Sequence, residues 1–176
     1  MKEMINAGVH FGHQSKYWNP KMRPFIYTTY KKLHIINLEK SVSCFNLAKI
    51  FIEKLCKNNS KILFVGTKRA ARNIIKKYAT DVKMPYVNNR WLGGMLTNFD
   101  TVKKSIQKLD DLKSSLESSS SEMMTKKESL MIKKQIAKLE KNLSGIKTLE
   151  KKPDALFVID TRYEKIAIQE ANKLNI

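Results

Sequence analysis

Residues 10–27, HFGHQSKYWNPKMRPFIY, combine two histidines, five aromatic residues, three basic residues and two prolines. Three kinds of chemistry fit this composition: a metal site on His10 and His13, a catalytic loop, or a surface that binds nucleic acid. A zinc site has three or four protein ligands, and no pair of cysteines or further histidines stands nearby to complete one. We therefore predict no metal here, and a structural or RNA-facing role for the two histidines.

Catalysis by a nucleophile needs a base beside it and a group that orients the base. The candidate side chains lie in no recognised local signature; they are His34, Ser41, Cys44 and Asp160. The residues alone therefore do not support a catalytic loop.

The overall charge favours a nucleic-acid surface. Thirty-four lysines and arginines face sixteen acidic residues, which gives a net charge of +18 and a pI of about 9.9. The 42% hydrophobic fraction argues against a disordered basic tail. A folded, strongly cationic domain usually has a polyanionic partner. Residues 153–176 carry three basic and four acidic residues, so we do not expect this last segment to belong to the basic surface.

Other partners and compartments fit less well. No apolar run approaches the roughly 20 residues that span a bilayer, so we predict no membrane insertion, and binding to an anionic membrane surface is a minor alternative. The N-terminal MKEMINAGVHFG lacks the apolar region of a signal peptide. Cys44 and Cys56 lie twelve residues apart and resemble neither a CxxC metal pair nor a disulfide framework. We therefore expect buried or idle thiols in a reducing, cytoplasmic compartment.

The turn at Gly66 is a candidate phosphate site. It follows an apolar run and begins the segment GTKRAAR, so amide hydrogens at the start of a helix would point toward a phosphate. It lacks the GxGxxG and GxxxxGK[ST] patterns of nucleotide sites. Lys68, Arg69 and Arg72 could equally bind an RNA backbone, or form only a solvated basic face. An enzyme of Rossmann-like fold that binds a phosphorylated small molecule here is the alternative function.

The segment RWLGGMLTNF, residues 90–99, is the most distinctive. Its two glycines permit a sharp turn, and Trp91 and Phe99 are expected to bury their rings beside it. Structural packing and RNA contact are about equally plausible for the segment as a whole. Within it, Arg90 is the residue that we assign to RNA.

Strand-like and helical patterns alternate along the chain. The expected strands are residues 34–38, 62–65, 86–91 and 154–160. The spacing of apolar residues predicts a helix over 39–57, with Val42, Phe45, Ala48, Ile52 and Leu55 on its buried face. Two further buried helix faces are expected, one with Ala70, Ile74 and Tyr78, the other with Ile166, Ala167, Ala171 and Leu174. This alternation predicts a parallel sheet covered by helices on both faces.

Residues 101–150 have a different pattern. Apolar residues recur at alternating steps of three and four, as in a coiled-coil seam. The two seams are Val102, Ile106, Leu109, Leu112 and Leu116, then Ile132, Ile136, Leu139, Leu143 and Ile146. The serine run 118–121 separates them, and Thr125 with Glu128 has the form of a capping box. We therefore predict an antiparallel coiled-coil hairpin that protrudes from the α/β body and serves an interaction.

In the opening stretch, Pro20 and Pro24 are expected to hold an extended loop. Its basic side chains can neutralise phosphates, while Tyr17 and Trp18 either stack on a base or anchor the loop to the domain. We favour a rigid RNA-facing loop whose aromatic rings mostly anchor it.

Several segments, in this order and spacing, resemble a known family. They are AGVHFGHQSKYWNPKMRPFIY, HIINLEKS, ILFVGTKRAA, YVNNRWLGGMLTNF, TKKESL, GIK and PDALFVID. Together they resemble the bacterial form of the second protein of the small ribosomal subunit. The resemblance covers nearly the entire chain, and the combination of VHFGHQ, the NPKM segment and RWLGGMLTN is highly specific.

The resemblance implies a flavodoxin-like, Rossmann-like α/β fold with a coiled-coil hairpin. It implies binding to small-subunit ribosomal RNA on the solvent side, near the junction of head and body, without catalysis, cofactor or small-molecule substrate. The large first protein of the subunit is one expected neighbour. The expected location is the ribosome in the bacterial cytoplasm, or an organellar ribosome.

We expect residues 1–100 and 151–176 to form the globular domain and residues 101–150 the hairpin. Members of the family normally continue beyond the position of Ile176, so the globular domain is expected to be incomplete at that end. The predicted RNA-binding residues are Lys16, Lys21, Arg23, Lys31, Lys32, Lys68, Arg69, Arg72, Arg90, Lys103 and Lys104.

Overall fold

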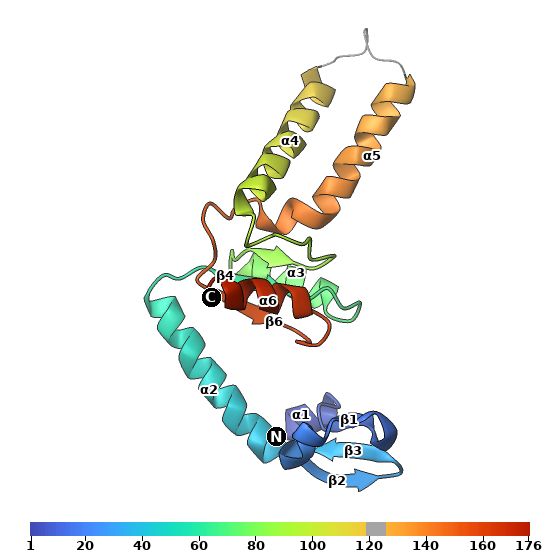
Figure 1. Cartoon of the computed structure of the whole chain (residues 1–176), viewed down its shortest axis with the longest axis vertical. Helices are drawn as coiled ribbons and strands as arrows, with labels where there is room; N and C mark the ends of the chain where they lie inside the picture. Colours follow the sequence, from blue (N-terminus) through green and yellow to red (C-terminus); the bar gives the residue numbers. More distant parts are fainter. Residues whose placement is uncertain (119–125) are drawn as a thin grey trace. The chain divides into compact units, whose positions relative to one another are not determined.

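The computed structural model describes residues 1–118 and 126–176 (Figure 1). They form two compact units, Met1–Asn59 and Ser60–Ile176. Most of the serine run that separates the predicted seams, and Thr125 of the predicted capping box, lie outside the described residues. Every helix in the described ranges is too short or too polar for a membrane span.

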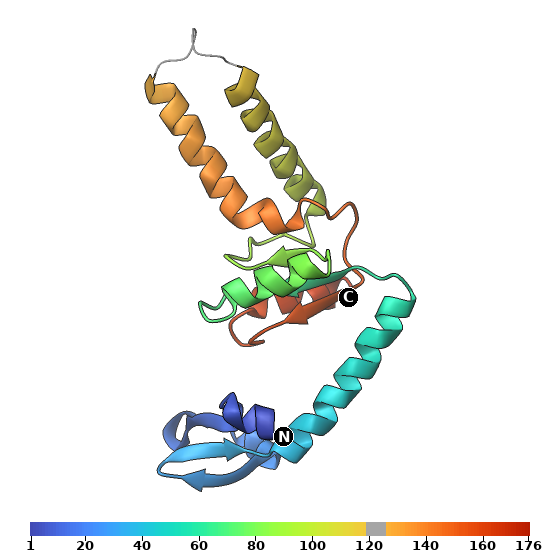
Figure 2. The ribbon, with the colours of Figure 1, turned by 180° about the vertical axis from the view of Figure 1, so that it is seen from behind.

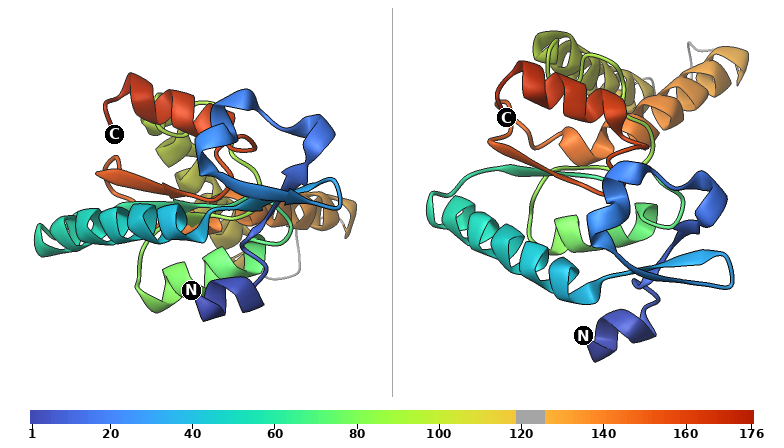
Figure 3. Two further views of the ribbon diagram at one scale, coloured as in Figure 1. Left: turned by 90° about the horizontal axis from the view of Figure 1, so that it is seen from below. Right: turned by 60° about the horizontal axis from the view of Figure 1, so that its bottom comes forward.

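The unit Met1–Asn59 is a small antiparallel sheet followed by one long helix. Its strands are ordered β1-β3-β2, and both neighbouring pairs are antiparallel. Figure 3 shows the β2–β3 hairpin leading into the long helix α2. The elements are α1 (Lys2–Asn6), β1 (Phe11–Gln14), the 3-10 turns η1 (Ser15–Tyr17) and η2 (Pro20–Phe25), β2 (Ile26–Tyr30), β3 (Leu33–Ile36) and α2 (Leu38–Lys57).

The expectation that the strand at 34–38 joins a parallel sheet is wrong. This segment is β3, and it pairs with β2 through a turn whose two central residues are Lys31 and Lys32. A connection of two residues can join only antiparallel neighbours, because a parallel pair needs a crossover of a dozen residues or more. Both lysines have positive φ, 45° and 64°, at positions where Asn-Gly is the usual choice.

The proline-rich loop was predicted to be extended, but in the structure it is wound into η2. Asn19 precedes this turn, and its side chain accepts a hydrogen bond of 3.0 Å from the Lys21 amide. Pro20 fits the first position of such a turn, because a backbone N–H there would have no acceptor within the turn and proline has no N–H. The Trp18 ring lies 5.4 Å from the ring of His34 on β3, but Trp18 is 38% exposed and the other four aromatic residues of the opening stretch are 40–75% exposed, so the expectation that the rings mostly anchor the loop is wrong.

The predicted helix over 39–57 is confirmed as α2, which Asn37 caps by accepting from the amides of Glu39 and Lys40. Its predicted apolar face is not buried: all twenty residues of α2 are described and none is buried, with Phe45 61% exposed. Cys44 and Cys56 are exposed free thiols, which excludes the buried alternative for both and leaves the idle one.

The unit Ser60–Ile176 contains a parallel sheet with the order β5-β4-β6. Helices α3 and α6 lie on opposite faces of this sheet, as Figures 1 and 2 show from front and back. The prediction of a parallel α/β arrangement is confirmed for this unit. The elements are β4 (Ile62–Val65), α3 (Arg72–Asp81), β5 (Tyr86–Val87), α4 (Phe99–Ser118), α5 (Lys126–Leu143), η3 (Ser144–Ile146), β6 (Ala155–Val158) and α6 (Lys165–Lys173).

The core of this unit joins the sheet to α6, to the segment after β5, and to α4 and α5 through Val102 and Leu143. Leu63 and Val65 of β4 are almost fully buried against a cluster that includes Ala167 and Ala171. The predicted face of α3 is wrong by one residue, because Ile75 is buried while Ile74 is 53% exposed. Gly66 explains this close packing: a Cβ added at Gly66 would meet the Cγ1 atom of Ile75 at 2.8 Å. The prediction for α6 holds for its two alanines, but Ile166 is 55% exposed.

Helices α4 and α5 pack against each other. Lys113 of α4 pairs with Glu140 of α5, and Asp110 of α4 pairs with Lys147 just after η3, so an earlier position on α4 meets a later position on the returning chain. The two helices are therefore antiparallel, as predicted. Of the residues in the predicted seams, Leu109 and Leu143 are almost completely buried, with exposed fractions of 0% and 1%.

Candidate nucleic-acid interface

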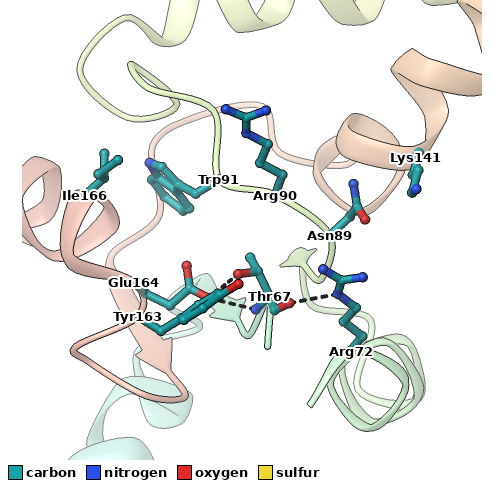
Figure 4. Close-up of a pocket in the computed structure, with 9 residues that line it drawn as sticks. All are labelled: Thr67, Arg72, Asn89, Arg90, Trp91, Lys141, Tyr163, Glu164 and Ile166. Carbon is teal, nitrogen blue, oxygen red and sulfur yellow. Dashed lines mark hydrogen bonds between the residues drawn. The ribbon is translucent and has the colours of Figure 1, made fainter. Parts of the chain in front are cut away.

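A polar cleft of about 440 Å³ lies in the unit Ser60–Ile176 (Figure 4). Its lining comes from segments that follow each of the three parallel strands and from helices α3, α5 and α6. The lining residues are Thr67, Arg72, Asn89, Arg90, Trp91, Lys141, Tyr163, Glu164 and Ile166.

The parallel sheet explains why these segments meet. Thr67 follows β4, Asn89 follows β5 and Tyr163 follows β6. The carboxyl ends of parallel strands lie at one edge of a sheet, and ligands of open α/β sheets bind outside that edge. The cleft therefore occupies the usual binding position of such a sheet.

The floor of the cleft is fixed by a buried carboxylate. Glu164 is 4% exposed, and its Oε1 atom accepts a 2.8 Å bond from the Thr67 amide and a 2.6 Å bond from the Thr67 hydroxyl. These bonds occupy the amide that a phosphate at the Gly66 turn would use. The alternative function, a phosphorylated small molecule bound at this turn, finds no support in this geometry.

Two predicted RNA-binding residues line this cleft. Arg72 is the first residue of α3, and its Nε atom donates a 2.7 Å bond to the Thr67 carbonyl. This bond fixes the guanidinium group at the wall of the cleft (Figure 4). Arg90 is exposed and directly precedes the buried Trp91.

A third cation, Lys141, was not predicted. It is exposed near the end of α5, and the adjacent Asn142 accepts a 2.6 Å hydrogen bond from the side chain of Asn89. This bond ties α5 to the segment after β5. Three cations from three separate elements therefore surround one cleft.

Lys68 lies at the same edge of the sheet but is paired. Its Nζ atom is 2.7 Å from Oδ2 of Asp160. The hydrogen bond from Lys68 holds the pKa of the Asp160 carboxyl below its usual value, helped by the Tyr163 amide, and the same pair raises the pKa of Lys68. Both side chains are partly or largely exposed, so the pair contributes little to stability.

The segment after β5 is organised by a second acidic residue that sequence reasoning missed. Glu170 of α6 is 9% exposed and accepts five hydrogen bonds. The donors are the Trp91 indole (3.1 Å), the amides of Gly94 (2.7 Å), Leu96 (3.0 Å) and Thr97 (3.2 Å), and the Thr97 hydroxyl (3.3 Å). Desolvation opposes ionisation of this carboxyl, but the hydrogen bonds outweigh it, and its pKa lies below the ordinary value of 4.5.

The distinctive RWLGGMLTNF segment is therefore largely structural. Trp91 and Phe99 are both 7% exposed, which confirms the prediction that their rings are buried. Gly94 has φ of +87°, a conformation that L side chains rarely adopt, and its amide bonds to Glu170. Arg90 is the exposed cation at the edge of this segment.

The unit Met1–Asn59 has a basic cleft of its own, of about 800 Å³. Three predicted RNA-binding residues, Lys16, Lys31 and Lys32, line it together with Tyr30. Lys16 Nζ lies 4.7 Å from the centre of the Tyr17 ring, and Lys31 Nζ lies 5.4 Å from that of Tyr30. Its other lining residues are Gln14, Ser15 and Leu33.

The remaining predicted RNA-binding residues lie on the exposed surface of their own units, namely Lys21, Arg23, Arg69, Lys103 and Lys104. The His10 ring packs 4.0 Å from the Phe11 ring, and His13 is exposed on β1. Among the described residues there is no cluster of three side chains that could hold a metal.

A comparison with protein-family models matches residues 4–176 to the family described as Ribosomal protein S2.

Proposed function

Since the chain belongs to the ribosomal protein S2 family, we propose that it binds small-subunit ribosomal RNA through the two basic clefts described above. Membership makes the protein a structural constituent of the small ribosomal subunit and not an enzyme. It also implies contacts with ribosomal RNA and with other ribosomal proteins. The geometry supports a specific surface for the RNA contact.

The observation that carries the proposal is the meeting of Arg72, Arg90 and Lys141 around one cleft. Phosphate contacts supply most of the affinity of a protein for nucleic acid, and lysine and arginine provide them. A guanidinium group also offers a planar fork of donors that matches a phosphate. Arg72 is already held in place by Thr67, so less rotamer freedom is lost when it binds.

The cleft in Met1–Asn59 supports the proposal independently. Lys31 and Lys32 form the tip of the β2–β3 hairpin in a strained backbone conformation, and strain of this kind is concentrated at functional sites. The tip presents two charges beside the exposed Tyr30 ring. Cations next to an exposed aromatic ring are the combination that RNA-binding surfaces use.

The resemblance supports a finer placement. It favours the solvent side of the subunit near the junction of head and body, with the large first protein as a neighbour, in a bacterial or organellar ribosome. Counted along the chain, the three parallel strands lie in the order second, first, third (β5-β4-β6). The first three strands of a flavodoxin-like sheet have the same order. The heptad-like seams of α4 and α5 favour a coiled coil. In this proposal residues 101–150 form an interaction arm, and residues 1–100 and 151–176 form the globular part.

Binding that depends on phosphate contacts must weaken with salt. If about six to ten phosphates are engaged, affinity for ribosomal RNA falls by several orders of magnitude between low and moderate salt. Replacing Arg90 and Lys141 together by alanine reduces the slope of log affinity against log salt by about two. The measurement is fluorescence anisotropy with a labelled small-subunit RNA fragment over a salt series.

The matched control replaces Lys76 and Lys77 by alanine. Both are exposed lysines of α3, so this variant loses the same charge as the cleft variant. We expect the control to lose less affinity than the cleft variant. Equal losses from both pairs would show that net charge alone drives binding. An affinity that barely responds to salt would contradict RNA binding through phosphate contacts.

The hairpin tip gives a prediction in which stability and binding change in opposite directions. Replacing Lys31 by Asn and Lys32 by Gly relieves the backbone strain and raises the free energy of unfolding of Met1–Asn59 by about 1 kcal/mol. The same change removes two cations and weakens RNA binding. Thermal melting and RNA affinity, measured side by side, test both effects. A variant with arginine at both positions keeps the charges and should retain binding. A stabilised Asn-Gly variant with undiminished affinity would exclude the tip as an RNA contact.

A further inference from the structure

The size of the cleft in Ser60–Ile176 limits what can enter it. Clefts that hold one small ligand have volumes of about 300–1,000 Å³, and this one measures about 440 Å³. A double helix can lie only across the mouth of such a cleft. A single nucleotide turned out of its stack can enter, as happens where proteins read unpaired RNA.

One aromatic ring of the cleft is available for stacking. Tyr163 is 62% exposed, whereas Trp91 is 7% exposed and donates its indole N–H to Glu170. The Tyr163 amide donates to the carbonyl of Asp160 (3.0 Å) and to its side chain (3.1 Å). The ring is therefore presented to the cleft from a fixed turn (Figure 4). Stacking on an exposed ring is the general way in which proteins hold an unpaired base.

The cations of the cleft suit the backbone of a nucleic-acid strand better than a free nucleotide. Nucleotide cofactors place their phosphates on amide groups at the turn after the first strand. Here the Thr67 amide at that turn is bonded to Glu164. The positive charge lies instead on the side chains of Arg90 and Lys141, which are exposed and so can reach a phosphate that continues into a chain.

We infer that this cleft binds one unpaired nucleotide of the ribosomal RNA, with its base on the ring of Tyr163 and its phosphates beside Arg90 and Lys141. This inference rests on the proposed function and adds to it the kind of RNA that the cleft selects. The protein then distinguishes single-stranded or bulged RNA from a regular duplex at this position.

The test compares two RNA probes on the full chain. One is a single-stranded oligouridylate of about ten nucleotides, within the usual range of single-strand sites, and the other is a blunt RNA duplex. Replacing Tyr163 by alanine lowers the affinity for the single strand by about five-fold to one hundred-fold, the range measured for a lost stacking contact. Affinity for the duplex changes little, and the salt slope stays the same because no charge is removed.

Two further variants separate stacking from other effects. Tyr163→Phe keeps the ring and should bind the single strand almost as the parent does. Tyr78→Ala removes another tyrosine of the same unit, 59% exposed on α3 and outside the cleft lining, and should leave binding unchanged. If Tyr163→Ala melts at a lower temperature than the parent, Tyr163→Phe and Tyr163→Leu are compared instead. Both side chains fill the position, but only phenylalanine can stack on a base.

The possible failures can be told apart. If Tyr163→Ala binds the single strand normally while the double variant of Arg90 and Lys141 loses affinity, the inserted nucleotide is excluded and the RNA surface stands. If neither variant affects binding, this cleft is not part of the RNA surface, and only the proposed cleft in Met1–Asn59 stands. If uridine monophosphate competes as well as the oligonucleotide at equal concentration, the cleft is a small-molecule site and the inference is overturned.

Discussion

Replacing Glu170 by alanine should lower the free energy of unfolding of Ser60–Ile176 by about 3–5 kcal/mol. The carboxylate is the shared acceptor for the Trp91 indole and for the amides of the segment from Gly94 to Thr97. Without it, buried donors lose their partner, and each unsatisfied buried group costs about 1–3 kcal/mol. Chemical denaturation followed by circular dichroism measures the loss.

Two variants of α6 calibrate this result. Glu170→Gln keeps one carbonyl acceptor but turns an NH₂ group toward N–H donors, so we expect an intermediate loss. Gln169→Ala changes the exposed neighbouring residue and should stay within about 0.5 kcal/mol of the parent. A loss for Glu170→Ala no larger than that of the Gln169 variant would show that the amides do not depend on the carboxylate.

The same carboxylate makes stability depend on pH. Desolvation raises the pKa of Glu170 and the hydrogen bonds lower it, with a net value below the ordinary 4.5. A lowered folded-state pKa means that the carboxylate stabilises the fold fully above about pH 4.5, and that this contribution is lost as pH falls through the folded-state value. The parent should therefore lose more stability than Glu170→Gln on acidification through this range.

Replacing Leu109 by aspartate should lower the free energy of unfolding by about 4 kcal/mol or more. Leu109 of α4 is completely buried beside Asp110, which pairs with Lys147, and one turn before Lys113, which pairs with Glu140 of α5. Aspartate there removes a large apolar contact and brings an unpaired charge into the helix interface. The loss should be visible as reduced helix content in circular dichroism and as an earlier denaturation midpoint.

The control makes the same substitution at an exposed leucine. Leu130 of α5 is 54% exposed, so Leu130→Asp should cost little stability. Similar melting of the two variants would mean that Leu109 does not hold the helices together. The parallel strands should survive in either case, since Leu109 is not part of the core cluster that contains Leu63 and Val65.

Local sequence pattern was sufficient for β4, but it predicted a strand over 86–91 where β5 spans only Tyr86–Val87. The apolar run at 62–65, ended by Gly66, could only be a short buried strand, and β4 has those bounds. Pattern failed where the turn chemistry was unusual. The hairpin of β2 and β3 turns on two lysines with positive φ, which carry none of the Asn-Gly signal of such turns. The buried face of α3 was also misplaced, because its register depends on how close Gly66 lets Ile75 approach.

Of the candidate site, only Arg72 and Arg90 were predictable. Arg72 belongs to the basic segment after the Gly66 turn and Arg90 to the distinctive segment 90–99, and both line the cleft. Glu164 and Glu170 were missed because their partners lie far along the chain, 97 residues away for Thr67 and 76 for Gly94. A cluster of acidic residues in the last segment of a strongly basic chain was the available signal, and it was used only to exclude that segment from the basic surface.

The distance between Gly94 and Glu170 also sets an order of events during synthesis. A chain grows from its N-terminus at about 5–20 residues per second, so the 76 residues between these positions take roughly 4–15 s to make. Until then the segment that carries Arg90 lacks its acceptor. The cleft of Met1–Asn59 can therefore form early in synthesis, whereas the cleft lined by Arg72, Arg90 and Lys141 is completed only when α6 has been made.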